Sequence, residues 1–278
     1  MKDKVCIVTG SNSGIGKETA LALSNMGAKV VMVVRNKERG EKALSEIIKK
    51  TGNHNTVLMI CDLSSLNSIR QFTKEFTDKY DVLNVLINNA GAVFDKRQIT
   101  VDGFERTLAV NYLGPFLLTH ELLPLLKSSA PSRIITLSSG LYKSGKIHLD
   151  DLQSEKNYNG MSVYASVKLM VLMYTYKLAR CLECTRVTVN TVLPGFVATN
   201  LGRNSGSRRS SLMFRLVRPF QISAKKGAET SVYLASSSEV EGVTGKCFSK
   251  GKETTTSPTS YNPKMQTLLW DATTKLLG

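Results

Sequence analysis

A cluster of glycines near the amino terminus constrains the fold of this 278-residue chain more than any other feature. The β-branched apolar run over 5–9 predicts a buried parallel strand, and a helical pattern follows over 17–26. A strand, a glycine turn and a helix in this order place backbone N–H groups where a pyrophosphate binds. The predicted phosphate-binding turn comprises Gly10, Ser11, Asn12, Ser13, Gly14, Ile15 and Gly16. An ordinary glycine-rich turn is the alternative.

Strand and helix patterns alternate along most of the chain. Strands are expected at 5–9, 29–34, 56–60, 82–87, 132–137, 186–193 and 245–249, and helices at 17–26, 38–50, 65–80, 102–126, 161–181, 224–236 and in the tail from 261. Such alternation predicts an α/β fold, a doubly wound, seven-stranded parallel sheet with helices on both faces. Because no long linker precedes residue 200, we expect one domain over 1–278.

The second strand ends at Arg35, where a site for NAD would place an acidic residue against the ribose 2′-hydroxyl. A guanidinium can instead bind a 2′-phosphate through paired donors. The sequence therefore favours NADP over NAD as cofactor. The alternative is a solvated arginine at a strand end.

Further candidates follow the third, fourth and fifth strands. Asp62, with Leu63 beside it, could accept from an adenine amine or cap the helix that starts near Ser65. Small and amide-bearing residues let the backbone pass close to a cofactor, or form a simple turn: Asn88, Asn89, Ala90 and Gly91. Ser139 follows the fifth strand, and the carboxyl ends of such strands face the ligand crevice.

Tyr164 and Lys168 are four residues apart in a segment whose composition favours helix, so they lie on one helical face. A positive charge beside a phenol favours phenolate and lowers the phenol's pKa from about 10. A phenol tuned in this way can act as a general acid or base. The pair alone is weak evidence, since this spacing also occurs on surface helices.

Asn111 lies in a long apolar helical stretch, where an asparagine is often a structural hydrogen bonder. Pro115 is expected to kink that helix close to it.

The net charge of +15 has three explanations: a solvated basic surface, attraction to an acidic membrane surface, or an anionic cofactor. Nucleic-acid binding is disfavoured because the cations are dispersed and no recognition module is present. Five scattered cysteines indicate reduced thiols. No segment reaches the roughly 20 apolar residues of a membrane span, so we expect a cytoplasmic protein that could contact a membrane peripherally.

Residues 202–211 have a loop-like composition, and 211–220 mix apolar side chains with Arg215 and Arg218. We expect a substrate lid around 200–222 that carries a short amphipathic helix. An apolar face with basic flanks suits an apolar substrate or a membrane surface. A helix packed on the core is the alternative.

Together, these motifs occur in the order seen in the short-chain dehydrogenase/reductase family, which the chain resembles over nearly its whole length. The motifs are the glycine turn, Asn88 to Gly91, Asn111, Ser139, the Tyr164 and Lys168 pair, and Pro194 with Gly195. The segment from Asp151 to Glu155 and the long interval from Ser139 to Tyr164 resemble the retinol dehydrogenase group.

The resemblance implies a role for each matching residue. Tyr164 would donate the proton in carbonyl reduction, Lys168 would hold the nicotinamide ribose and lower the pKa of Tyr164, and Ser139 would bond the substrate oxygen. Asn111 would hold a water that links Lys168 to solvent. The nicotinamide carboxamide would be oriented by the segment after the sixth strand: Pro194, Gly195, Val197 and Thr199. No metal is implied.

The resulting expectation is an NADP-dependent oxidoreductase that interconverts an apolar carbonyl compound (a retinoid, steroid or fatty aldehyde) and its alcohol. A catalytically silent dinucleotide-binding sensor or scaffold is the alternative, although such a protein would be expected to lose Tyr164 or Lys168. By analogy with the family, a homodimer would pair through the helices that carry Asn111 and Tyr164.

Overall fold

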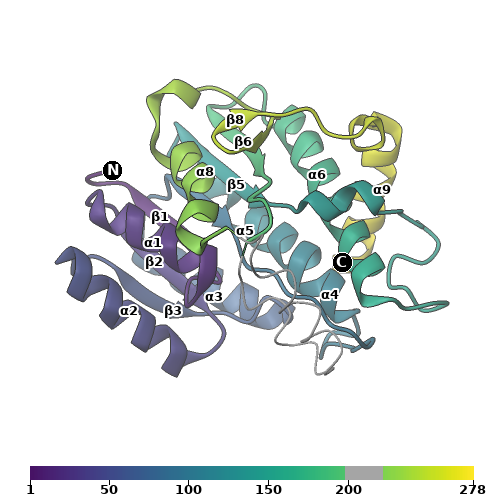
Figure 1. The fold of residues 1–278 in the computed structure, drawn as a ribbon, viewed down its shortest axis with the longest axis horizontal. Coiled ribbons are helices and arrows are strands. Elements are labelled where there is room, and N and C mark those ends of the chain that lie inside the picture. The colour runs from purple at the N-terminus through teal and green to yellow at the C-terminus, as the bar shows by residue number, and fades with distance from the viewer. Residues whose placement is uncertain (198–221) are drawn as a thin grey trace.

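The computed structural model describes residues 1–197 and 222–278, and its centre is one sheet (Figure 1). Seven strands are parallel: β1 (Val5–Thr9), β2 (Lys29–Val34), β3 (Val57–Ile60), β4 (Val85–Asn88), β5 (Ser132–Leu137), β6 (Val187–Val192) and β7 (Cys247–Ser249). Their order is β3-β2-β1-β4-β5-β6-β7. The order reverses next to β1, so β1 and β4 form the crevice where ligands of doubly wound sheets bind.

The predicted doubly wound fold is confirmed, but the sheet has eight strands rather than seven. The extra strand, β8 (Lys252–Glu253), pairs antiparallel with β7. Lys250 and Gly251 form the connection, with φ angles of 51° and 74°. Positive φ at both central residues is typical of a two-residue hairpin turn. The strand is only two residues long, which is too short for an alternation of apolar and polar residues to predict it.

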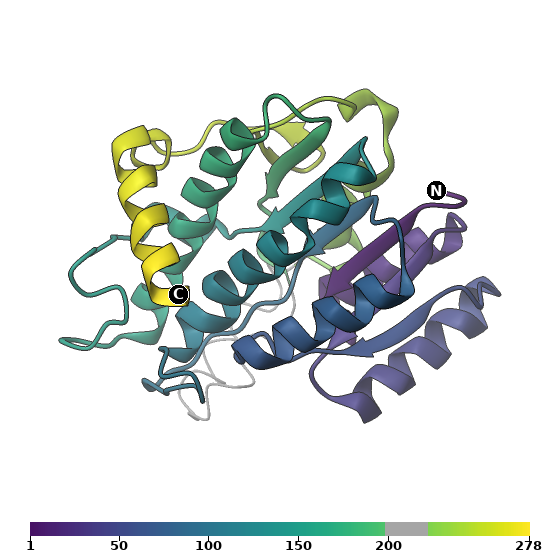
Figure 2. The same cartoon turned by 180° about the vertical axis from the view of Figure 1, so that it is seen from behind.

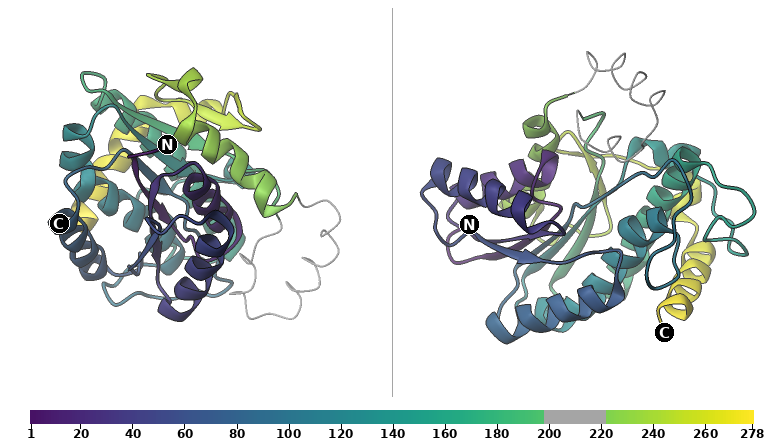
Figure 3. Two further views of the ribbon diagram at one scale, coloured as in Figure 1. Left: turned by 90° about the vertical axis from the view of Figure 1, so that its left-hand side faces the viewer. Right: turned by 90° about the horizontal axis from the view of Figure 1, so that it is seen from below.

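Two apolar cores lie on opposite faces of the sheet, each covered by helices (Figure 3). One face carries α1 (Gly14–Asn25), α2 (Lys37–Thr51) and α8 (Ala224–Ser236). The other carries α3 (Leu66–Lys79), α5 (Gly114–Ser128), α6 (Gly160–Cys181) and α9 (Pro263–Leu277), which lie side by side in Figure 2. Short 3-10 turns occupy Gly140–Ser144, Ser238–Val240 and Pro258–Tyr261.

The helix expected over 102–126 is divided into three parts. A short helix, α4 (Arg106–Leu108), leads into a π-helical turn, Ala109–Leu113, before α5 begins. Pro115 has no N–H, so the Asn111 carbonyl lacks its usual α-helical donor. The Gly114 N–H bonds to the Ala109 carbonyl, five residues back. The regular α-helical bonding is therefore interrupted over 109–113, and π turns of this kind are frequent at functional sites.

The predicted C-terminal helix is present as α9, and it packs on α6. Leu269 is only 1% exposed. Trp270 lies against two aromatic rings of the neighbouring helices, with centroids 5.2 Å from Phe116 and 5.8 Å from Tyr174. This aromatic contact fixes α9 on the helix that carries Tyr164 and Lys168.

The substrate lid around 200–222, with Arg215 and Arg218, lies outside the described residues apart from Ile222, which forms a parallel bridge with Val197. Within 1–197 and 222–278, none of the helices is long and apolar enough to cross a membrane.

Docking of α9 can be tested with two neighbouring leucines. Leu269→Ala should lower the free energy of unfolding by about 2–5 kcal/mol, because it removes buried methyl groups and leaves a cavity. Leu268 is 43% exposed, so Leu268→Ala should change it by no more than about 0.5 kcal/mol. Urea denaturation of both variants measures the difference. Equal effects would show that α9 does not pack as described.

Candidate active site

A cavity of about 850 Å³ opens at the carboxyl edge of the sheet and runs from the glycine turn to α6. Fifteen of the predicted site residues line it: Gly10, Asn12, Ser13, Gly14, Ile15, Gly16, Arg35, Asp62, Leu63, Asn89, Ala90, Gly91, Tyr164, Lys168 and Pro194. The structure therefore brings into one cavity residues from segments far apart in sequence, as the doubly wound topology requires.

Two glycines of the turn are required by close backbone contacts. Gly10 has φ of 65°, and a Cβ there would lie 2.9 Å from the Ala90 Cα. A Cβ on Gly16 would lie 2.3 Å from the Asn89 side-chain nitrogen and 2.5 Å from the Gly10 carbonyl oxygen. Any larger residue at either position would push β1 and α1 away from the end of β4.

Thr9 and Asn89 hold the ends of β1 and β4 together. The Asn89 side-chain amide donates to the Thr9 carbonyl at 2.7 Å, and the backbone N–H groups of Asn89 and Ala90 donate to the Thr9 hydroxyl at 3.0 Å. Because the Asn89 side-chain amide is bonded to the protein itself, this residue supports the cavity wall by holding the ends of β1 and β4 together.

The amino end of α1 opens into this cavity and suits an anion. Ser13 is the N-cap residue, but its side chain makes no capping bond, and the first turn contains no acidic residue. The first N–H groups of a helix have no partner within the helix and carry partial positive charge. The turn therefore fits the pyrophosphate of a dinucleotide.

Sequence reasoning found Arg35 but missed the basic residues around it. Lys17, Arg39 and Lys42 also line the cavity, and Lys17 forms an ion pair with Glu46. Arg39 lies four residues after Arg35, in the first turn of α2, where Asn36 caps the helix by accepting the Arg39 N–H at 2.9 Å. The four-residue spacing of the two arginines was the available signal.

Asp62 lies at the cavity wall, but it does not cap α3. Its carboxylate accepts from the Ser64 N–H at 2.9 Å and from the Ser64 hydroxyl at 2.7 Å. Ser65 caps α3 by accepting from the Ser68 N–H. Of the two predicted roles, helix capping therefore belongs to Ser65.

Tyr164 and Ser139 approach each other at the α6 end of the cavity. Burial raises the pKa of Tyr164 to about 12, and a hydrogen bond with Ser139 acts in the opposite direction. The lowered pKa expected from the neighbouring lysine is therefore wrong for this structure. Burial is the largest cause of the raised pKa, and the Lys168 Nζ lies 5.5 Å from the centre of the phenol ring, over its face.

Lys168 is 3% exposed and brings its amine into the protein interior. The Nζ donates to the Leu137 carbonyl at 2.9 Å, and the Ser138 hydroxyl donates to the Lys168 carbonyl at 2.8 Å. Burial disfavours the charged form and lowers the pKa of Lys168 to about 8. The amine is therefore poised to change its charge near neutral pH.

Asn111 lies behind this site rather than on the cavity wall. Its side-chain nitrogen donates to the carbonyls of Ala92 and Thr107, both at 2.8 Å, and its oxygen accepts from the Ala92 N–H at 3.2 Å. A Cβ on Gly91 would lie 2.9 Å from the Asn111 oxygen and 3.7 Å from the Lys168 Nζ. The side chain thus fixes the backbone of Ala92, after the end of β4.

Four further predicted residues lie outside the cavity lining: Ser11, Ser139, Gly195 and Val197. Ser11 is fully buried, and its hydroxyl has no partner within the described residues. Gly195 has a positive φ, Val197 packs against the backbone of Gly227, and Thr199 lies outside the described residues. Phe94, Val110 and Ser138 line the cavity and were missed, because they carry no motif of their own.

The low pKa of Lys168 predicts how its replacement depends on pH. Between about 8 and the unperturbed 10.5, the unfolded chain holds a proton that the folded chain has released, so this residue adds stability as pH rises. The free energy of unfolding of Lys168→Met minus that of wild type should therefore fall by up to roughly 3 kcal/mol over this window. Urea denaturation at pH 7, 8, 9 and 10 measures it. A difference independent of pH would contradict the buried amine.

Comparison with protein families places the site in context. A model of the family described as short chain dehydrogenase matches residues 4–210. Human retinol dehydrogenase 14 is 42% identical over 100% of this chain and 87% of its own length. Human retinol dehydrogenase 12 is 43% identical over 99% of this chain and 86% of its own length.

Solved structures show the same fold. An uncharacterized protein from Mycobacterium paratuberculosis superimposes with a TM-score of 0.81, is 29% identical, and is matched over 99% of this chain and 94% of its own. A short chain dehydrogenase from Escherichia coli CFT073 complexed with NADPH superimposes with a TM-score of 0.69 at 23% identity, over 91% of this chain and 98% of its own.

Proposed function

This chain belongs to the short-chain dehydrogenase/reductase family, in its retinol dehydrogenase-like group, and we propose that it is an NADP-dependent oxidoreductase that interconverts retinal and retinol or a similarly apolar carbonyl–alcohol pair. One observation carries the proposal: a single cavity joins the glycine turn to the Tyr164 phenol and the Lys168 amine. Family membership supports an oxidoreductase acting on CH–OH groups; the cofactor preference and the substrate belong to the proposal.

The preference for NADP is supported by charge. Arg35, Arg39 and Lys42 line the cavity beside the end of β2, where the adenosine ribose of a dinucleotide lies in folds of this type. A 2′-phosphate carries negative charge that a guanidinium can bind with two parallel hydrogen bonds. NAD offers only a hydroxyl there, so it would gain less from the same residues.

A bound nicotinamide supplies or accepts the hydride. In the reducing direction, the Tyr164 phenol gives its proton to the substrate oxygen as the hydride reaches the carbonyl carbon, and the Ser139 hydroxyl bonds to the same oxygen. A pKa of about 12 keeps the phenol protonated at neutral pH, in the form that reduction requires. Lys168 holds the nicotinamide ribose and, as a cation, stabilises the phenolate that forms.

Several assignments extend this proposal. Asn111 positions Lys168, and the residues of the glycine turn with Asp62, Leu63, Asn89, Ala90, Gly91, Pro194, Gly195, Val197 and Thr199 hold the dinucleotide. The chain forms one domain over 1–278. A homodimer through α5 and α6 would have to avoid α9, which packs on α6.

A catalytically silent dinucleotide-binding protein is the less favoured alternative. It needs the glycine turn but not a buried amine beneath a phenol, and burying an amine costs stability. The presence of both Tyr164 and Lys168 at the end of the cavity therefore favours an enzyme.

Cofactor preference is tested by Arg35→Asp. The affinity for NADPH should fall at least about tenfold, since a hydrogen bond to a charged group contributes roughly 1.5–3 kcal/mol. The affinity for NADH should be kept or improved, because the new carboxylate can accept from the ribose 2′-hydroxyl. Fluorescence titration with each nucleotide measures both.

Arg186→Asp is the matched control, because it makes the same charge change at an exposed site at the amino end of β6. Equal losses of NADPH affinity in the two variants would show that Arg35 acts only through the net charge of the protein and not by binding the 2′-phosphate directly. If wild type binds neither nucleotide at tens of micromolar, the oxidoreductase proposal fails.

The proton transfer is tested by Tyr164→Phe. The change removes only the phenol oxygen, so NADPH should bind with nearly unchanged affinity, while retinal reduction should fall by about 10²–10⁴-fold. Steady-state rates with all-trans-retinal, decanal and a steroid ketone measure the loss for each substrate class. Activity within twofold of wild type would remove Tyr164 from the mechanism.

A further inference from the structure

Glu105 is a buried carboxylate close to the active site that has no part in the mechanism above. It is 0% exposed and caps α4, where one carboxylate oxygen accepts from the Thr107 N–H at 2.8 Å and the other from the Leu108 N–H at 2.7 Å. Burying a carboxylate costs free energy unless it is well bonded. These bonds are shorter than is usual for a backbone donor, so they hold the turn at 105–108 firmly.

The phenol of Tyr158 joins this carboxylate to the loop that follows β4. Its oxygen lies 2.8 Å from the Phe94 carbonyl, 3.2 Å from the Glu105 carboxylate and 3.1 Å from the Thr107 hydroxyl. Burial first, and then the charge of Glu105, raise the pKa of Tyr158 to about 12, so the phenol keeps its proton. Tyr158 therefore bonds at once to the segment after β4 and to the start of α4.

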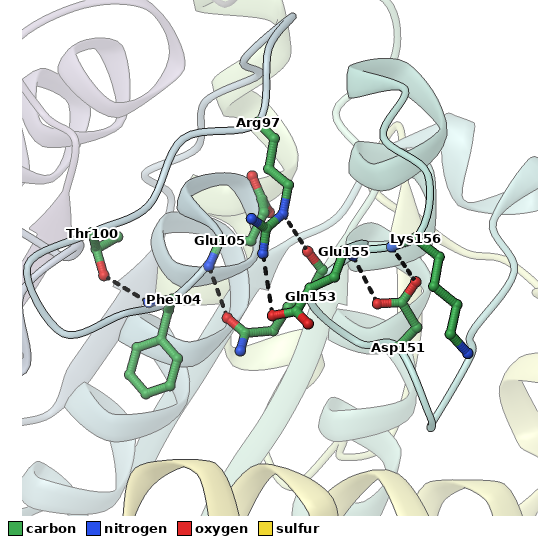
Figure 4. A network of polar contacts seen from close by, with 8 residues as sticks. All are labelled: Arg97, Thr100, Phe104, Glu105, Asp151, Gln153, Glu155 and Lys156. Carbon is green, nitrogen blue, oxygen red and sulfur yellow. Dashed lines mark hydrogen bonds and ion pairs between the residues drawn. The ribbon is translucent and has the colours of Figure 1, made fainter.

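A second set of bonds links Glu105 and Arg97 to the segment 151–156, as Figure 4 shows. The Glu105 N–H donates to the Gln153 side chain at 3.0 Å, and Arg97 donates to the Gln153 carbonyl at 3.1 Å. Arg97 also pairs with Glu155 at 3.4 Å. The segment from Asp151 to Glu155, which marks the resemblance to retinol dehydrogenases, thus joins Arg97, in the loop after β4, to Glu105 at the start of α4.

One hydrogen bond connects this network to Asn111. The Thr107 carbonyl accepts from the Asn111 side chain at 2.8 Å, and Thr107 is fixed by Glu105. A shift of the turn at 105–108 would therefore move Asn111, and with it the backbone of Ala92, to which the Asn111 side chain is bonded.

A close backbone contact connects the same network to the start of α6. A Cβ on Gly160, the first residue of α6, would lie 2.3 Å from the Phe94 carbonyl oxygen, the same oxygen that accepts from Tyr158. Phe94 itself lines the cavity. Holding this carbonyl in place therefore sets where α6 begins and how Tyr164 enters the cavity.

We propose that Glu105 is a positioning residue for the active site: through Thr107 and Tyr158 it fixes the two elements that carry the proposed catalytic side chains. The proposal rests on the proposed function, and it assigns the segment 151–155 the task of keeping those elements in register. A misplacement of about 1 Å can cost a catalytic site about 10²-fold in rate.

Two substitutions test this in the full chain. Glu105→Gln replaces one acceptor oxygen with an NH₂ group that opposes a backbone N–H, and Tyr158→Phe removes only the phenol oxygen. Each should lower kcat for all-trans-retinal by about tenfold or more, while the Kd for NADPH changes less than about twofold, because the glycine turn is untouched. The pH midpoint of kcat should also shift in both, since Asn111 and Lys168 move. Glu75→Gln, the same change at an exposed position of α3 outside this network, should change neither.

The double variant provides a further check. Residues that act through one contact are not additive, so the double variant should lose no more kcat than the more damaged single variant. If Glu105→Gln does not fold, as judged by its thermal melt, Tyr158→Phe decides the question alone.

Unchanged kcat and an unchanged pH profile in folded variants would overturn the positioning role and leave the proposed function intact. Lower stability with normal kcat would also overturn it, by showing a merely structural contact. A wild type that binds no NADPH or reduces no retinal would overturn both proposals together.

Discussion

The buried amine of Lys168 is the constraint to which the rest of the site responds. An ammonium taken out of water is costly unless it is paired, and here the only donation that Lys168 makes to a described residue is to the Leu137 carbonyl. Gly91 has no side chain, and a Cβ there would lie only 2.9 Å from the Asn111 side-chain oxygen behind the amine. Burial also moves its pKa toward neutrality, which makes an otherwise inert lysine useful in proton chemistry.

A second requirement is that two halves of the sheet meet at one cavity. The ends of β1 and β4 are joined by Thr9 and Asn89, and Gly10 and Gly16 allow the backbones to come within contact distance. The dinucleotide-binding half and the catalytic half of the cavity are therefore joined at the ends of β1 and β4. The position of α6 relative to α1 depends on this junction and on the hydrogen bonds around Phe94 and Tyr158.

Much of this arrangement could be predicted because local patterns and global fold agree. The ranges of β1, β2 and β5 match the predicted strands, and most of the glycine turn, several strand-end residues and the Tyr164 and Lys168 pair line the cavity. These features depend on periodicity and on spacing within one element, which a sequence displays directly.

The missed features depend on contacts between distant segments. The π turn at Asn111 depends on Pro115 and on bonds to Ala92, and β8 is too short to show a pattern. The raised pKa of Tyr164 depends on burial, which spacing alone does not reveal. Arg39 and Glu105 belong to helix starts that look ordinary in sequence. Their partners, around the end of β2 and in the loop at 151–158, become neighbours only in the folded chain.

The docking of α9 has a consequence for how the protein is made. Synthesis proceeds from the amino terminus, so α5 and α6 leave the ribosome well before the helix that covers them. Until Trp270 arrives, the rings of Phe116 and Tyr174 form an exposed aromatic surface on the catalytic helix and its neighbour. Nascent chains would therefore be prone to aggregate through this surface. A chaperone that shields exposed aromatic side chains would raise the yield of native protein.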